Sequence, residues 1–193
     1  FSDTDVDAAV ARGASFCFAN TGQSCNAATR MLVERGSYER AVEVAKATAE
    51  ATVVDLPSKA GGHIGPLVSQ AQFDKVQRLI QAGIDEGARL VAGGTGRPDG
   101  LNRGWFAKPT VFADTTPDMT IMREEIFGPV LAMMPFDSED EAIEIANDTP
   151  YGLAAYIQTG SAERARRVAA RLRAGMIQVN GAGRVSGAPF GGY

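Results

Sequence analysis

The alternation of short apolar runs with longer amphipathic segments constrains the fold of this chain more than any other feature. Segments whose apolar residues recur every three or four positions indicate helices, and short apolar runs between turn residues indicate strands. The predicted helices are 6–18, 38–52, 70–86, 138–146 and 162–172, and the predicted strands are 31–33, 89–92, 111–112, 130–134, 154–158 and 176–179. Strands that alternate with helices favour parallel pairing. The sequence therefore predicts an α/β fold with a largely parallel sheet flanked by helices.

Composition and charge exclude several classes of protein. The chain has 193 residues, of which 45% are hydrophobic and 22% charged, so it is unlike a disordered protein. A formal net charge of −4 gives no electrostatic reason to expect nucleic acid or an anionic membrane as a partner. No apolar run is long enough to span a bilayer. Two cysteines are too few for a disulfide framework and suit a reducing compartment, so we expect a cytoplasmic protein.

Cys25 is a candidate nucleophile because of its expected position. It follows residues 20–24 (Asn-Thr-Gly-Gln-Ser) in a predicted turn between a helix and a strand. Backbone N–H groups at such a turn favour the thiolate, whose formation has an intrinsic pKa of about 8.5. Without family knowledge, however, residue type favours a small buried cysteine at this position. Cys17 keeps that second interpretation, because Phe16 and Phe18 flank it within an apolar helix.

Other familiar catalytic and cofactor patterns do not match. His63 is the only histidine, and neither its distance from Cys25 nor the residues around Cys25 fit a thiol protease. The two cysteines have no histidine or carboxylate at metal-ligand spacing, so we expect no metal site. The glycines of 94–100 and 181–187 each miss the G-x-G-x-x-G spacing by one residue. The chain therefore carries no Rossmann fingerprint, and turns explain both clusters.

Residues 124–130 (Glu-Glu-Ile-Phe-Gly-Pro-Val) place two carboxylates and an aromatic ring directly before a predicted strand. A carboxylate can accept charge-assisted hydrogen bonds from ribose hydroxyls, and an aromatic ring can pack on a flat ring. A solvated turn that ends at Pro129 is the alternative. Composition alone leaves both interpretations open.

The segment 18–25 resembles the nucleophile motif of the aldehyde dehydrogenase family, in which an aromatic residue leads into N-x-G-Q-x-C. Other landmarks of that family follow in order along the chain. They are Gly-Pro at 65–66, Gly-Trp-Phe at 104–106, Pro-Thr-Val at 109–111, the segment 124–130, Asn147 with 151–153, Gly175 with 179–180, and Pro-Phe-Gly-Gly-Tyr at 189–193. The resemblance covers essentially the whole chain and implies the α/β catalytic-domain fold of that family.

The resemblance also implies a reaction and its residues. Cys25 would attack an aldehyde carbonyl to give a thiohemiacetal, with its own N–H forming part of an oxyanion hole. A hydride would then pass to the nicotinamide of NAD or NADP, and water would hydrolyse the thioester to a carboxylic acid. Glu125 would hold the nicotinamide ribose and Phe127 would pack beside the nicotinamide. Gln72 and Lys75 would contact the adenosine-side ribose, unless they are simply residues of a helix surface.

The same resemblance predicts the domain organisation. Residues 1–193 would be the nucleophile-bearing catalytic domain of a longer homo-oligomeric protein. The cofactor-binding domain, a general-base glutamate in an E-L-G-G-K segment and an oxyanion-hole asparagine would precede it, and a C-terminal tail would follow. We therefore expect the chain to be inactive alone. A CoA-acylating semialdehyde dehydrogenase, in which CoA resolves the thioester, and a non-catalytic assembly module with an inert thiol remain the alternatives.

Overall fold

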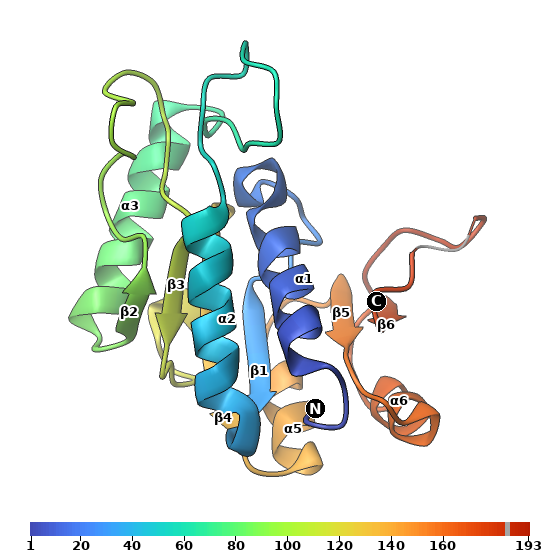
Figure 1. Cartoon of the computed structure of the whole chain (residues 1–193). Helices are drawn as coiled ribbons and strands as arrows, with labels where there is room; N and C mark the ends of the chain where they lie inside the picture. Colours follow the sequence, from blue (N-terminus) through green and yellow to red (C-terminus); the bar gives the residue numbers. More distant parts are fainter. Residues whose placement is uncertain (184–185) are drawn as a thin grey trace.

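The computed structural model describes residues 1–183 and 186–193, so part of the 181–187 glycine cluster lies outside the described residues. Its centre is a four-stranded sheet in the order β1, β4, β3, β2 (Figure 1). The strands are β1 (Arg30–Glu34), β4 (Val130–Phe136), β3 (Thr110–Ala113) and β2 (Arg89–Ala92), with only β2 antiparallel to its neighbour. A second sheet pairs β5 (Ala154–Ile157) with β6 (Met176–Val179) in parallel. The predicted α/β class with a largely parallel sheet is confirmed.

Helices cover both faces of the four-stranded sheet. Helices α1 (Val6–Phe18) and α2 (Tyr38–Ala51) pack together on one face, where they bury Leu131 and Met133. Helix α3 (Gln70–Asp85) covers the other face, with Val130 and Ala132. Successive side chains of a strand point to opposite faces, so β4 supplies both cores. A strand buried on both faces reads as a continuous apolar run, as 130–134 does.

Side-chain caps set the starts of most predicted helices. The side chain of Asp5 accepts a hydrogen bond from Ala8 N at 3.0 Å, and Ser69 and Ser138 act in the same way at α3 and α5 (Glu139–Asn147). Ser37 directly precedes α2, but its side chain makes no capping bond. A serine therefore stands before the helix start at α2, α3 and α5, although only Ser69 and Ser138 make a capping bond.

Two elements differ from the sequence prediction. Helix α6 (Ala162–Ala169) ends before the predicted residue 172 in a turn, in which Leu172 N still donates to Val168 O at 3.1 Å. The Asn147 side-chain amide donates to Arg171 O at 2.9 Å and accepts from Arg173 N at 2.8 Å, so the helix does not continue beyond this turn. Helix α4 (Thr120–Arg123) was not predicted, because four residues are too few to show a helical period.

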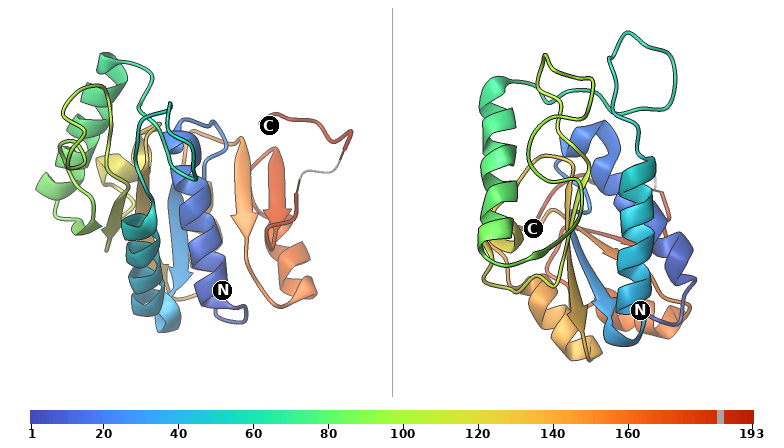
Figure 2. Two further views of the ribbon diagram at one scale, coloured as in Figure 1. Left: turned by 45° about the horizontal axis from the view of Figure 1, so that its top comes forward. Right: turned by 60° about the vertical axis from the view of Figure 1, so that its left-hand side comes forward.

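The β5–β6 pair stands beyond β1, on the side away from β4 (Figure 2). Its own core, with Ile143, Ile157 and Val168, is separate from the two larger ones. A cavity of about 700 Å³ separates β1 from β5, and Cys25 lies on its wall. The arrangement therefore places the candidate nucleophile where the two sheets face each other.

Candidate active site

The turn that leads into Cys25 has an unusual backbone. Asn20 (φ 52°), Thr21 (φ 58°) and Gly22 (φ 70°) adopt the left-handed conformation in succession, directly after α1. Non-glycine residues rarely adopt positive φ, and the surrounding structure must stabilise them when they do. Thr21 is buried, and its hydroxyl donates to Gly65 O at 2.9 Å. This backbone carries Cys25 out of the helix to an exposed position.

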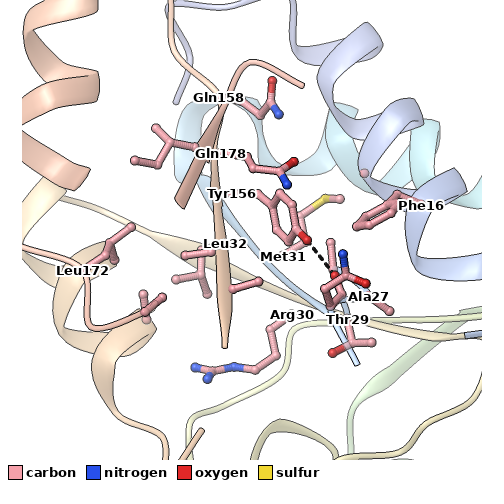
Figure 3. Close-up of a pocket in the computed structure, with 18 of the residues that line it drawn as sticks. Phe16, Ala27, Thr29, Arg30, Met31, Leu32, Tyr156, Gln158, Leu172 and Gln178 are labelled. Atoms are coloured by element: carbon pink, nitrogen blue, oxygen red, sulfur yellow. Dashed lines mark hydrogen bonds between the residues drawn. The ribbon is translucent and has the colours of Figure 1, made fainter. Parts of the chain in front are cut away.

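Side-chain bonds anchor the turn on both sides of Cys25. Before the thiol, Gln23 accepts a bond from Val68 N at 2.8 Å and donates to Pro66 O at 3.4 Å. After it, the Tyr156 hydroxyl donates to Asn26 O at 2.7 Å, the bond drawn in Figure 3. Burial raises the pKa of Tyr156, and the hydrogen bond to Asn26 opposes that shift only in part. Tyr156 was not among the predicted site residues, because it comes from a distant strand.

The two cysteines occupy opposite environments. Cys17 is fully buried in α1, where its Sγ donates to Val130 O at 3.4 Å. Burial raises the pKa of the Cys17 thiol far above its usual range. Cys25 is exposed, so the buried-cysteine alternative holds for Cys17 and is wrong for Cys25. Only Cys25 is placed to meet a ligand.

The loop that carries Glu125 and Phe127 packs directly on the Cys25 turn. A Cβ atom on Gly22 would lie 2.0 Å from Gly128 O, so the two backbones touch. Phe127 itself has φ 56°, a third strained position close to the thiol after Asn20 and Thr21. The structure thus brings the segment 18–25 into contact with the segment 124–130, although they are far apart in the sequence.

Gln72 and Lys75 hold this loop from α3. The Gln72 amide donates to Ile126 O at 3.0 Å and to Phe127 O at 2.8 Å, and Lys75 Nζ donates to Glu125 O at 2.6 Å. These bonds fix the carbonyls on both sides of the strained Phe127. Both side chains therefore hold the loop that carries Glu125 and Phe127, and the structure shows no bond that tests their predicted contact with the adenosine-side ribose.

The two adjacent carboxylates differ in their partners. Glu124 lies 3.5 Å from Arg78 in an ion pair. The Glu125 carboxylate accepts no hydrogen bond from any residue that the structure describes, although its backbone N–H donates to Tyr151 at 3.2 Å. Glu125 and Phe127 line the same cavity as Cys25. The free carboxylate is therefore the one available to a ligand.

His63 lies on the loop 55–66 and does not line the cavity. Among the described residues, no group of three or more His, Cys, Asp or Glu side chains could hold a metal ion. Among residues 1–183 and 186–193, no helix is long and apolar enough to cross a membrane.

Known proteins of one family match this chain along its whole length. The family model for the "Aldehyde dehydrogenase family" matches residues 1–193. A 3-succinoylsemialdehyde-pyridine dehydrogenase of a Pseudomonas species is 50% identical over 99% of this chain and 40% of that protein. An aldehyde dehydrogenase structure from Bartonella henselae has 56% identity and a TM-score of 0.98, covering 100% of this chain and 40% of that one. A mutant of aldehyde dehydrogenase C from Pseudomonas syringae, in complex with NAD+ and octanal, has 46% identity, a TM-score of 0.98 and the same coverage.

The chain spans about 40% of the length of the relatives that it matches. Its motifs, its fold and its matches all indicate the same family. The chain belongs to the aldehyde dehydrogenase family.

Proposed function

We propose that the whole protein oxidises an aldehyde to a carboxylic acid with NAD or NADP, and that Cys25 is its nucleophile. One observation carries the proposal: the exposed Cys25 and the unpaired Glu125 carboxylate line one cavity, while Glu124 is held by Arg78. The family assignment supports the reaction, and the relative solved with NAD+ and octanal supports both the cofactor and the substrate class.

The proposed first step forms a bond between Cys25 Sγ and the aldehyde carbon. The thiolate supplies the electron pair, and the carbonyl π electrons move to the oxygen, which becomes an oxyanion. The backbone N–H of Cys25 makes no hydrogen bond with any described residue, so it can donate to that oxyanion. The anchors at Gln23 and Tyr156 would hold this N–H and the thiol in fixed relation.

Bound NAD or NADP would supply a nicotinamide ring that accepts the hydride from the tetrahedral carbon. The residues present fit such a group, because a free carboxylate and an aromatic ring share one short loop. Glu125 would accept hydrogen bonds from ribose hydroxyls, and Phe127 would pack beside the ring. Gln72 and Lys75 would keep that loop in position. Water would finally cleave the Cys25 thioester, which releases the acid and restores the thiol.

The test uses the whole protein, octanal as the probe aldehyde, and the absorbance of NADH or NADPH. Cys25→Ser should abolish reduction of the cofactor, whereas Cys17→Ala should retain it, because Cys17 is buried away from the cavity. Product analysis with and without CoA separates hydrolysis from acyl transfer, and octanoic acid without any need for CoA is expected. Sustained turnover by Cys25→Ser would contradict the proposal, and a requirement for CoA would favour the acylating alternative.

A further inference from the structure

Tyr151 contacts the loop that carries Glu125 and Phe127. It lies between α5 and β5, in the part of the chain that leads into the second sheet. Its hydroxyl accepts a hydrogen bond from Glu125 N at 3.2 Å, and Lys75 Nζ donates to Glu125 O at 2.6 Å from α3. The backbone of Glu125 is therefore held at its N–H by Tyr151 and at its C=O by Lys75, while its carboxylate accepts no bond from any described residue.

Contacts other than its hydroxyl hold Tyr151 in place. Tyr151 N donates to Thr149 Oγ1 at 3.2 Å, and Gly152 O accepts a bond from Gly175 N at 2.9 Å. A Cβ atom on Gly152 would lie 2.0 Å from Cε1 of Tyr193, so that ring packs closely on the backbone beside Tyr151. Removing the hydroxyl alone should therefore leave the Tyr151 ring where it is.

The Tyr151 hydroxyl has an unused proton. A phenol can donate one O–H and can also accept, and Glu125 N uses only its accepting capacity. The hydroxyl donates to none of the residues that the structure describes. Tyr151 is 50% exposed and lines the same cavity as Cys25 and Glu125. Its proton is therefore available to a ligand in this cavity.

The structure describes all four tyrosines of the chain, and the other three differ from Tyr151. The hydroxyls of Tyr38 and Tyr156 each donate to a backbone carbonyl, so their protons are already used. The Tyr193 hydroxyl accepts a bond from Arg173 and does not line the cavity. Tyr151 is the tyrosine that combines a free proton with a place on the cavity wall.

A free donor beside a free acceptor matches the chemistry of a ribose hydroxyl. Such a hydroxyl donates its own proton and accepts another through its oxygen. It can therefore donate to the Glu125 carboxylate and accept from the Tyr151 hydroxyl at the same time. The bond from Glu125 N keeps the phenol beside the residue that carries the carboxylate.

We propose that Tyr151 is a second contact for the ribose on the nicotinamide side of NAD or NADP, and donates to the hydroxyl that itself donates to Glu125. This inference rests on the proposed function, which assigns that ribose to Glu125. The carboxylate provides the charge-assisted bond, and the phenol fixes the direction of the ribose hydroxyl, because one partner only accepts and the other donates. The bound ribose would thereby connect the segment before β5 to the loop that carries Glu125.

Binding of NAD+ to the whole protein that carries Cys25→Ser tests this without turnover, by isothermal titration calorimetry. Tyr151→Phe removes only the hydroxyl and should raise the Kd about 2- to 12-fold, the loss expected for one hydrogen bond between neutral groups. Tyr193→Phe is the matched control and should leave the Kd unchanged, because its hydroxyl lies outside the cavity. An unchanged Kd in Tyr151→Phe would overturn the proposal.

Cofactor analogues separate a direct contact from a role in placing Glu125. Two NAD+ analogues each lack one of the two hydroxyls of the nicotinamide-side ribose. With the analogue that lacks the contacted hydroxyl, Tyr151→Phe should cause no further loss of affinity, because the bond is already absent. Equal losses with NAD+ and with both analogues would show that Tyr151 acts only through the position of Glu125, and would overturn the proposed contact.

Glu125→Gln in the same titration separates this inference from the proposed function. It should raise the Kd more than Tyr151→Phe does, because a hydrogen bond to a charged group is the stronger one. A raised Kd in Glu125→Gln with an unchanged Kd in Tyr151→Phe would overturn only the contact at Tyr151. Unchanged values in both variants would also overturn the assignment of the ribose to Glu125.

Discussion

Gly22 is the position where a single methyl group should do most damage to the site. A Cβ on Gly22 would lie 2.0 Å from Gly128 O and 2.2 Å from Gly128 C, which are backbone atoms that cannot swing away. The left-handed conformation at φ 70° costs an alanine about 1–2 kcal/mol, and the overlap should add about 1–3 kcal/mol. Gly22→Ala should therefore lower the free energy of unfolding by about 2–5 kcal/mol.

Urea denaturation of the chain, followed by circular dichroism, measures this change. Gly36→Ala is the matched control, because a Cβ there meets nothing within 4 Å and its φ is not positive. That variant should be neutral or should stabilise the fold by up to about 1 kcal/mol. If Gly22→Ala is no more destabilising than Gly36→Ala, the contact between the Cys25 turn and the 124–128 loop does not exist as described.

Three other predictions follow from the site. Limited alkylation with iodoacetamide and peptide mapping should label Cys25 well before Cys17, which is buried and has a raised pKa; a label that favours Cys17 would contradict the assignment. In the whole protein, Glu125→Gln should cost about 1.5–3 kcal/mol in kcat/KM through the lost charge-assisted bond, against little for Glu124→Gln, and equal kinetics would favour a solvated turn. The chain alone should not sustain NADH formation from octanal, because loss of a general base typically costs about 10²–10⁴ in rate and loss of cofactor positioning costs more; steady turnover would refute this.

Local patterns were enough to predict most of the fold. Residues 130–134 are all apolar and their side chains point alternately to the two faces of the sheet, which explains why β4 supplies both cores. Serines directly precede α3 and α5. Helix α4 and the early end of α6 were not predictable in this way. The first is too short for periodicity, and the turn after α6 bonds to the side chain of Asn147, which is remote in the sequence.

Some features of the candidate site could likewise be predicted from the sequence, and others could not. The buried position of Cys17 follows from the expected helix, whereas residue type favoured a buried Cys25 and the structure exposes it. Composition could not choose between a ribose-binding and a solvated role for Glu125, and family resemblance supplied the preference. The loop-holding bonds of Gln72 and the anchor at Tyr156 are long-range contacts, so no local sequence pattern reveals them.

Mass spectrometry of the acid-quenched whole protein tests the central claim most directly. With octanal and NAD+, the peptide that contains Cys25 should gain the mass of octanal less two hydrogen atoms, the composition of a thioester after hydride and proton loss. Without the cofactor this adduct should not form, because the carbon cannot be oxidised. The adduct should appear at the rate of the first turnover and be absent from Cys25→Ser. NADH formation without it, or an oxidised adduct on any other residue, would show that Cys25 is not the nucleophile.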